Sequence, residues 1–427
     1  MPKREAISSL HRTKALLIRA FDLQTSPGRI LALEGLRGFA ALLVFLVHFH
    51  GLFAVFLAPH SFVRKASRFA GSLGNTGVDL FFLLSGFLMY GIVLNKAPAF
   101  GSYLYRRVKR LYPVFIAVLA IYLALSRIIP QESRLPIPLG RAGLYVLANL
   151  AMLPGMLPIR PLVTVAWSLS YEWFFYLLLP LSIWGLRMRR WRAKARVGLV
   201  LLLCAIYYGL CMAHFGSHSR LIMFGSGICL WECANNCTAA SRLPSWGEYA
   251  AIFAMAASLS VAGLANIQSP SSMLSPATFP GLLGPLLFVS MFFFVLYVLQ
   301  HDGILRTLFS RDWLRAIGNM SYSYYLIHGL ALHGVQWAMR RLTPGRLLPL
   351  ALFLALTCVS LLVTLAAAAW LFLTIEKPFS LSKRIPAGEQ CRPSDASEDS
   401  SQNRRSVPST TAVNAVMDDS AQDFAAP

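Results

Sequence analysis

Arg37 and His48 are ionisable residues in an otherwise apolar stretch, LEGLRGFAALLVFLVHFH (33–50). In a helix their separation equals three turns plus about 20°, so both side chains are expected on one face, about 16 Å apart. His50 is rotated about 200° from His48 and is expected to point elsewhere. A neutral imidazole in a membrane interior can accept a proton from an attacking alcohol, as a general base. Arg37 could equally anchor the helix at the membrane boundary, with His48 as a hydrogen-bonded packing residue.

A second polar set lies in VAWSLSYEWFFYLLLP (165–180), where Ser168, Glu172 and Tyr176 repeat every four residues. This spacing predicts one polar stripe along a helix. A glutamate inside a membrane span is unfavourable unless it is paired. Glu172 is therefore expected to support His48 or to bind a sugar hydroxyl, or else to serve only as a structural hydrogen-bond partner.

Two other apolar stretches carry candidate substrate-binding residues. GNTGVDLFFLLSGFLMYG contains Asp79 and Ser85, and AIGNMSYSYYLIHGLALHG contains Tyr322 and His328. Asp79 could orient a substrate or cap its helix at the water interface. Tyr322 and His328 could line a polar cavity or simply pack against neighbouring helices.

The segment YRRVKR (105–110) concentrates cations, including Arg107 and Arg110, before an apolar run. Arginine forks match the geometry of phosphate groups, so the segment could bind a phosphorylated cofactor. A basic cluster beside a span is also an ordinary topology signal.

These stretches must be positioned by membrane helices. Hydrophobic residues make up 56% of the 427 residues and charged residues only 13%. This composition predicts an all-α integral membrane protein. Apolar runs of spanning length predict about ten transmembrane helices. The predicted spans are 38–57, 77–94, 112–128, 168–186, 197–214, 221–234, 248–266, 281–300, 320–338 and 348–375.

Charge supports this count. With ten spans and both termini cytoplasmic, the basic clusters at 105–110 and 187–196 fall on the same, inner side. The run at 143–157 is interrupted and short, so it is expected to be re-entrant or interfacial. The net charge of +21 then follows mainly from topology, and no nucleic-acid partner is needed to explain it.

The chain is expected to consist of a cytoplasmic basic lead (1–30), one membrane domain (31–384) and a disordered cytoplasmic tail (385–427). The first apolar run has no small-residue cleavage site and is expected to be retained. Cys229, Cys233 and Cys237 share a helical face without a partner set, which favours small-residue packing, and no metal is expected.

Taken together, these stretches resemble the membrane-bound acyltransferase-3 family, which includes the O-acetyltransferases of bacterial surface polysaccharides. The motifs occur in order: an arginine, ten residues and a histidine in the first stretch, then GVDLFFLLSGFLM, RRVKRLYP, WSLSYEWFFYLLLP, IGNMSYSYYLIH and IEKP. The resemblance covers about residues 30 to 380.

The resemblance implies a ten-span fold, a cytoplasmic acyl-CoA donor, usually acetyl-CoA, and a hydroxyl acceptor, commonly on a sugar. It implies catalytic roles for Arg37 and His48 and places Arg107 and Arg110 near the donor. It also implies that Asp79, Glu172 and Tyr322 line the same central site.

Three positions depart from the family pattern: Glu34, Ala166 and Trp173 stand where an aspartate, a histidine and a second acidic residue are common. The last two bear on the acceptor side, where Trp167 and Ser168 are expected to contact the substrate.

The resulting expectation is an O-acyltransferase of the bacterial inner membrane that acts on a carbohydrate or lipid-linked glycan. His48 would be the general base, Arg37 would steady the donor or the oxyanion, and Glu172 would orient His48 or the acceptor. A transporter or flippase for a sugar lipid could use the same residues as a polar path, and a non-catalytic sensor is a third possibility.

Overall fold

The computed structural model describes residues 18–23, 30–215, 218–236, 243–268 and 281–381. Within these ranges every regular element is a helix, which confirms the predicted all-α class for this part of the chain. The main helices are α2 (Leu31–Phe53), α3 (Phe62–Gly74), α4 (Thr76–Lys96), α5 (Phe100–Ile128), α6 (Leu139–Leu150), α7 (Ala166–Gly185), α8 (Ala193–Leu210), α9 (Ile222–Asn236), α10 (Ser245–Gln268), α11 (Leu283–Gln300), α12 (Ile304–Phe309), α13 (Asp312–Asn319), α14 (Ser321–Leu342) and α15 (Leu350–Leu371). α15 continues as π-helical turns over Phe372–Ser380. The predicted tail, Cys237 and most of the basic lead lie outside the described residues.

Among the described residues, seven helical stretches are long and apolar enough to cross a membrane. They are Leu31–Phe56, Phe62–Lys96, Phe100–Ile128, Ala193–Ala213, Ser245–Leu264, Leu283–Gln300 and Leu350–Ser380. These are the helices of an integral membrane protein.

Three predicted spans, 168–186, 221–234 and 320–338, correspond to α7, α9 and α14, which are not among the seven stretches. α9 has 15 residues and is therefore only about 22 Å long, shorter than the hydrocarbon layer of about 30 Å. Its residues from Ile222 to Glu232 are all buried. A helix that contacts protein on most sides can carry polar residues that a lipid-facing helix could not, so its average apolarity is lower.

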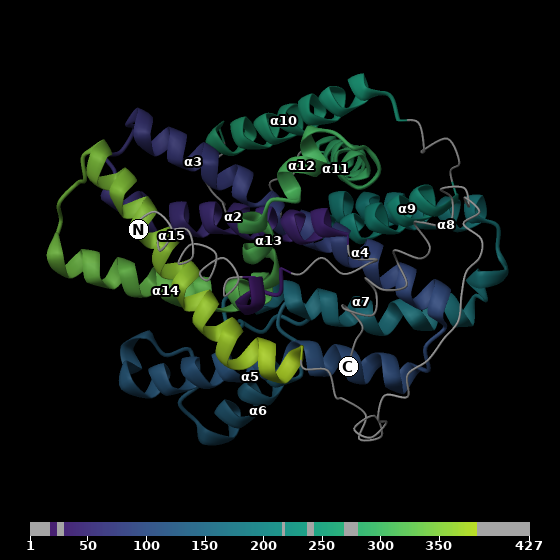
Figure 1. The fold of residues 1–427 in the computed structure, drawn as a ribbon. Helices are drawn as coiled ribbons and strands as arrows, with labels where there is room; N and C mark the ends of the chain where they lie inside the picture. Colours follow the sequence, from purple (N-terminus) through teal and green to yellow (C-terminus); the bar gives the residue numbers. More distant parts are fainter. Residues whose placement is uncertain (1–17, 24–29, 216–217, 237–242, 269–280, 382–427) are drawn as a thin grey trace, which may run out of the picture.

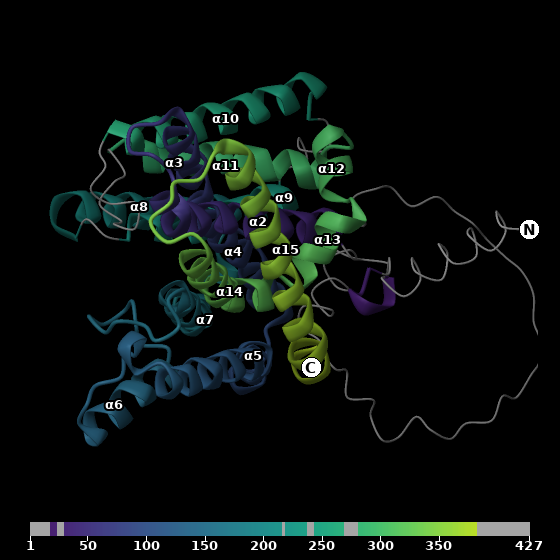
Figure 2. The ribbon, with the colours of Figure 1, turned by 90° about the vertical axis from the view of Figure 1, so that its left-hand side faces the viewer.

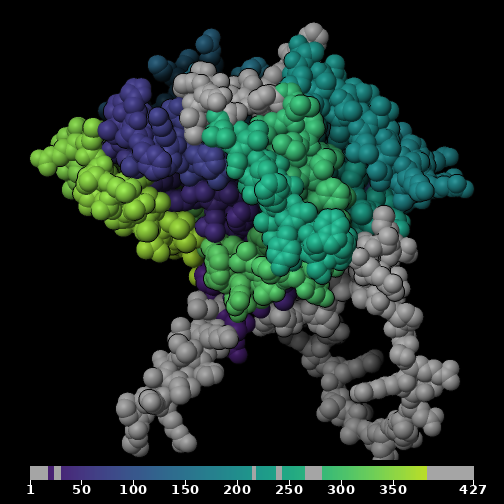
Figure 3. All heavy atoms as spheres, turned by 90° about the horizontal axis from the view of Figure 1, so that it is seen from above, coloured from purple at the N-terminus to yellow at the C-terminus, as the bar shows by residue number. Residues whose placement is uncertain are grey.

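α2 is the central helix of the bundle (Figure 1). It packs against α3, α4, α13 and α14, and Leu36, Ala40 and Val44 are fully buried. Seen from above, α3 and the green and teal helices α10 to α12 lie over α2 and hide much of it (Figure 3). The ionisable residues of the first predicted span are thus surrounded by protein.

α4 approaches its neighbours closely because small residues lie at the contacts. A Cβ atom at Gly77 would come within 2.6 Å of the Ala40 carbonyl oxygen of α2. A Cβ atom at Gly86 would overlap the Phe224 carbonyl oxygen of α9. Glycine is therefore required for α4 to fit between α2 and α9.

Two buried ion pairs each connect two helices of the bundle. Arg315 of α13 lies 2.9 Å from Glu34 of α2. Arg196 of α8 pairs with Glu232 of α9 at 2.5 Å, and the hydroxyl of Tyr90 also donates to Glu232. Because each buried charge has a partner, these pairs fix the relative positions of their helices.

α5 and α6 lie together along one side of the bundle (Figure 2). α5 packs against α7, α14 and the π-helical turns after α15. α6 has 12 residues, about 18 Å, so the run predicted as non-spanning forms a helix too short to cross a membrane.

Candidate active site

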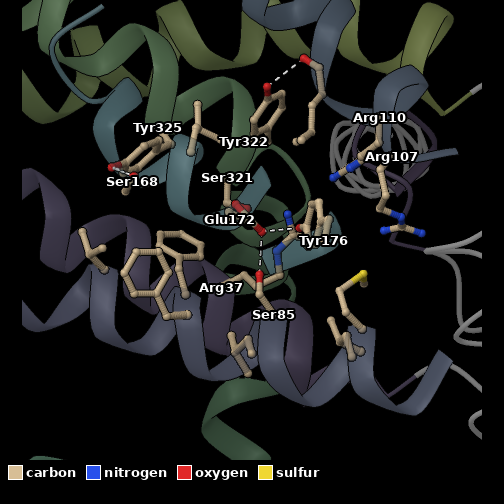
Figure 4. Close-up of a pocket in the computed structure, with 18 residues that line it drawn as sticks. Arg37, Ser85, Arg107, Arg110, Ser168, Glu172, Tyr176, Ser321, Tyr322 and Tyr325 are labelled. Carbon is tan, nitrogen blue, oxygen red and sulfur yellow. Dashed lines mark hydrogen bonds between the residues drawn. The ribbon is translucent and has the colours of Figure 1, made fainter. Parts of the chain in front are cut away.

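A cavity of about 100 Å³ lies where α2, α4, α5, α7 and α14 meet, which is room for several water molecules or a small acyl group. Arg107 and Arg110 lie at one end, and Ser168 and Tyr325 lie at the other (Figure 4). The lining residues are Arg37, Val78, Phe81, Phe82, Leu84, Ser85, Leu88, Met89, Arg107, Arg110, Leu111, Ser168, Leu169, Glu172, Tyr176, Ser321, Tyr322 and Tyr325. We call this cavity the central pocket.

Glu172 is the carboxylate of the central pocket. Its Oε1 accepts hydrogen bonds from the Ser85 hydroxyl, at 2.5 Å, and from the Tyr176 hydroxyl (Figure 4). The four-residue spacing in α7 places Tyr176 one turn from Glu172, as the sequence predicts, while Ser85 comes from α4. Two donors on one oxygen stabilise the ionised carboxylate and hold it in place.

Arg37 projects from α2 into the same space, beside Ser85 and Glu172 (Figure 4). It interacts electrostatically with Glu172 and Glu376 and with the cation of Arg110. The pocket therefore brings a cation of α2 near a carboxylate of α7, and charged groups inside a membrane helix bundle usually lie near opposite charges.

Two arginines of α5 form the basic end of the central pocket. Arg107 is 4% exposed, and its guanidinium lies 5.7 Å from the ring centre of Tyr103 and 5.9 Å from that of Tyr176. These contacts are cation–π interactions. They hold the guanidinium plane at the pocket wall.

Arg110 is held by Glu376, the glutamate of the IEKP motif. Arg110 Nη2 lies 3.1 Å from Glu376 Oε1. The other oxygen, Oε2, accepts hydrogen bonds from the backbone N–H and the hydroxyl of Ser323, at 3.1 and 2.5 Å. Glu376 is fully buried and ties α5 to α14. The IEKP motif is the only sequence signal that marks it.

Tyrosines of α14 close two sides of the pocket. The Tyr322 hydroxyl donates to the Leu111 carbonyl oxygen at 2.7 Å. The Tyr325 hydroxyl lies 2.5 Å from the Ser168 hydroxyl and 3.1 Å from the Val165 carbonyl oxygen. Ser85, Ser168 and Tyr322, predicted as substrate-binding residues, thus line one cavity with Glu172.

His48 does not line the central pocket. Its ring lies 4.9 Å from the ring of His328, which in turn lies 5.9 Å from the ring of Tyr325 in the pocket wall. His328 therefore lies next to the pocket wall, and His48 lies next to His328. His50 points away, as predicted, and its Nδ1 lies 2.8 Å from the Ser67 hydroxyl of α3.

Asp79 and Trp167, both predicted to bind substrate, also lie outside the lining of the central pocket. Asp79 is fully buried, with its carboxylate 3.9 Å from Arg220. Trp167 packs against the rings of Tyr171 and His218, at 6.3 and 6.2 Å. In the described part of the chain, no three His, Cys, Asp or Glu side chains gather as a metal site would require.

Residues 30–369 match the family model described as an acyltransferase domain. The chain belongs to the acyltransferase-3 family. This match covers most of the chain and includes every helix that lines the central pocket, and it ends before the turns that carry Glu376.

Curated relatives agree with this assignment. The chain is 32% identical over 157 residues to acyltransferase MdmB of Streptomyces mycarofaciens, covering 36% of this chain and 39% of the relative. It is 30% identical over 138 residues to the exopolysaccharide production protein ExoZ of Rhizobium meliloti, covering 31% of this chain and 41% of the relative. It is 28% identical over 218 residues to O-acetyltransferase OatA of Staphylococcus aureus, covering 47% and 32%.

The chain thus spans about two fifths of the length of the first two relatives. No solved structure matches it.

Proposed function

We propose that the protein is a membrane-embedded O-acyltransferase. It would move an acetyl group from cytoplasmic acetyl-CoA to a hydroxyl of a carbohydrate or lipid-linked glycan. The observation that supports this most is the central pocket, which runs from two arginines to a carboxylate and an arginine inside the bundle. The names of ExoZ and OatA favour a glycan acceptor and an acetyl group.

In this proposal the basic end of the pocket binds the donor. Arg107 and Arg110 would bind CoA phosphates, because guanidinium forks match phosphate geometry and form charge-assisted hydrogen bonds. The ten-span topology in the inner membrane, with both termini and this end of the pocket cytoplasmic, would allow the pantetheine arm to pass Tyr176 and Glu172. The membrane domain over 31–384 would then hold the whole site.

The transfer itself requires a base and stabilisation of the charge on the carbonyl oxygen. His48 lies outside the lining of the central pocket, so the proposal requires its side chain to reach the pocket when the substrates are bound. The acceptor hydroxyl would then lose its proton to His48 as its oxygen forms a bond to the acyl carbon and the carbon–sulfur bond breaks. His48 would then return the proton to the CoA thiolate, which leaves as CoA. Arg37 would stabilise the negative charge on the carbonyl oxygen, and Glu172 would orient the acceptor.

The donor side can be tested with purified protein in liposomes. Labelled acetyl-CoA and alkali-deacetylated surface polysaccharide are supplied, and both CoA release and label on the polymer are measured. In Arg110→Gln, KM for acetyl-CoA is expected to rise by about tenfold or more, because a hydrogen bond to a charged group is worth about 1.5–3 kcal/mol.

The matched control is Arg306→Gln, since Arg306 is an exposed arginine of α12 whose ion pair within the described residues is with Asp302, four positions earlier. This variant is expected to retain the wild-type KM. An unchanged KM in Arg110→Gln, or label transport without CoA release, would contradict the proposal.

A further inference from the structure

His328 is a buried histidine whose protonation pattern is set by its surroundings. Its Nδ1 lies 3.0 Å from the Tyr324 carbonyl oxygen. Because a carbonyl oxygen only accepts hydrogen bonds, Nδ1 carries the proton. In the neutral ring Nε2 is then a hydrogen-bond acceptor.

The Nε2 acceptor has no hydrogen-bond partner among the described residues, although His328 is fully buried. The titratable groups that face it are Tyr324 and Tyr325 of α14 and His48 of α2. The Tyr324 hydroxyl lies 3.3 Å from the Thr364 hydroxyl of α15, and the Tyr325 hydroxyl already contacts Ser168 and Val165. Of these three groups, His48 is the one left to donate a hydrogen bond to Nε2 of His328.

The two rings are placed for such a bond. Their centres are 4.9 Å apart and their planes are inclined by 57°. At this separation, ring nitrogens that face each other would lie within hydrogen-bond distance. Catalytic hydrogen bonds are often long without substrate and shorten when it binds. Another titratable group near His48 is His333, one further turn along α14.

We infer that His328 is a positioning residue that accepts a hydrogen bond from His48 through Nε2 and so leaves the other nitrogen of His48 free to act as the base. This inference rests on the proposed acyl transfer. The chain of contacts runs from His48 through His328 to the Tyr324 carbonyl oxygen. In this chain the Tyr324 carbonyl oxygen fixes His328, and His328 fixes the orientation of the base His48, as an orienting group does in other base-assisted acyl transfers.

The role differs from the substrate contact expected from the sequence. When His48 takes the hydroxyl proton it becomes a cation, and its bond to Nε2 becomes charge-assisted. The proton passes from the hydroxyl to His48 and then to the thiolate sulfur, while His328 keeps its Nδ1 proton throughout.

Three substitutions separate the acceptor role from a structural one. His328→Gln places an amide oxygen near the position of Nε2. His328→Asn places an amide near the position of Nδ1 and can keep the bond to Tyr324. His328→Phe keeps only the ring that stacks on Tyr324.

The liposome assay with acetyl-CoA and deacetylated polysaccharide is run on these variants. For Asn and Phe, kcat is expected to fall by about tenfold, the effect of losing one hydrogen bond to a charged group, with KM for acetyl-CoA unchanged. Gln is expected to restore most of that loss, because its amide oxygen replaces the acceptor. The acid limb of the kcat profile is expected to move to lower pH in Phe, because the protonated form of His48 loses its acceptor.

His50→Gln, on the opposite face of α2, is expected to behave as wild type. If His328→Asn is as active as wild type, or if Gln is no better than Phe, the acceptor role is wrong. If the wild-type protein itself releases no CoA, the proposed function fails, and the role of His328 in that reaction fails with it.

Discussion

Arg110 of α5 and Glu376 at the end of the last described helix form a buried ion pair, with Nη2 3.1 Å from Oε1. These residues are far apart in the sequence, yet the pair holds one of the two arginines at the basic end of the central pocket. Because Glu376 also binds Ser323, it connects the donor end of the proposed site to the helix that carries Tyr322, Tyr325 and His328.

Glu376→Gln is expected to weaken donor binding. The amide can still accept from Ser323 but no longer balances the charge of Arg110, so the guanidinium can turn away from the pocket. KM for acetyl-CoA should rise by about tenfold, and stability should fall by about 3 kcal/mol because a buried ion pair is broken. Kinetics in liposomes and thermal unfolding in detergent measure the two effects.

The control for this change is Glu232→Gln, which breaks the buried pair with Arg196 in α8 and α9, away from the central pocket. It should lower stability by a similar amount, about 3 kcal/mol, and leave KM unchanged. Equal KM changes in both variants would show that Glu376 acts only through stability.

Ser85→Ala and Tyr176→Phe each remove one hydrogen bond to the same oxygen of Glu172. Each change should lower kcat/KM by about tenfold, the effect of losing one hydrogen bond to a charged group. Because the two donors share an acceptor, the double variant should deviate from the product of the single effects.

Ser170→Ala is the matched control for these two changes, because in the described part of the chain the Ser170 hydroxyl bonds to the Ala166 carbonyl oxygen of its own helix. It should keep wild-type kcat/KM. Strictly independent effects of Ser85→Ala and Tyr176→Phe would argue against a shared role in holding Glu172.

Gly86→Ala tests the packing of α4 against α9. The added methyl group would overlap the Phe224 carbonyl oxygen, so the helices must separate, and overpacking of this kind costs about 1–3 kcal/mol. Gly198→Ala in α8, where the new Cβ meets open space, should instead raise stability by up to about 1 kcal/mol. Unfolding midpoints that move in the same direction would contradict this account.

Local patterns were enough to predict the helical class, the stripe of Ser168, Glu172 and Tyr176, and the opposite directions of His48 and His50. Each of these depends on periodicity within one helix. The Ser85–Glu172 contact and the pairing of Arg110 with Glu376 depend on how separate helices pack, which no local pattern specifies.

Other expectations stay predictions for the same reason. α9 was predicted to span the membrane, but it is short and buried among other helices. His48 shares a helix with Arg37, but its ring contacts His328 and it is not among the residues that line the central pocket. The sequence places a residue on a helix face but does not say which neighbouring side chain covers it.

The most direct test of the central claim compares wild type with His48→Ala in sealed liposomes supplied with labelled acetyl-CoA and deacetylated polysaccharide. Wild type is predicted to transfer one label for each CoA released, and His48→Ala to lower both rates together by about 100-fold or more. CoA release and label transfer at the wild-type rate in His48→Ala would contradict the assignment of His48 as the base.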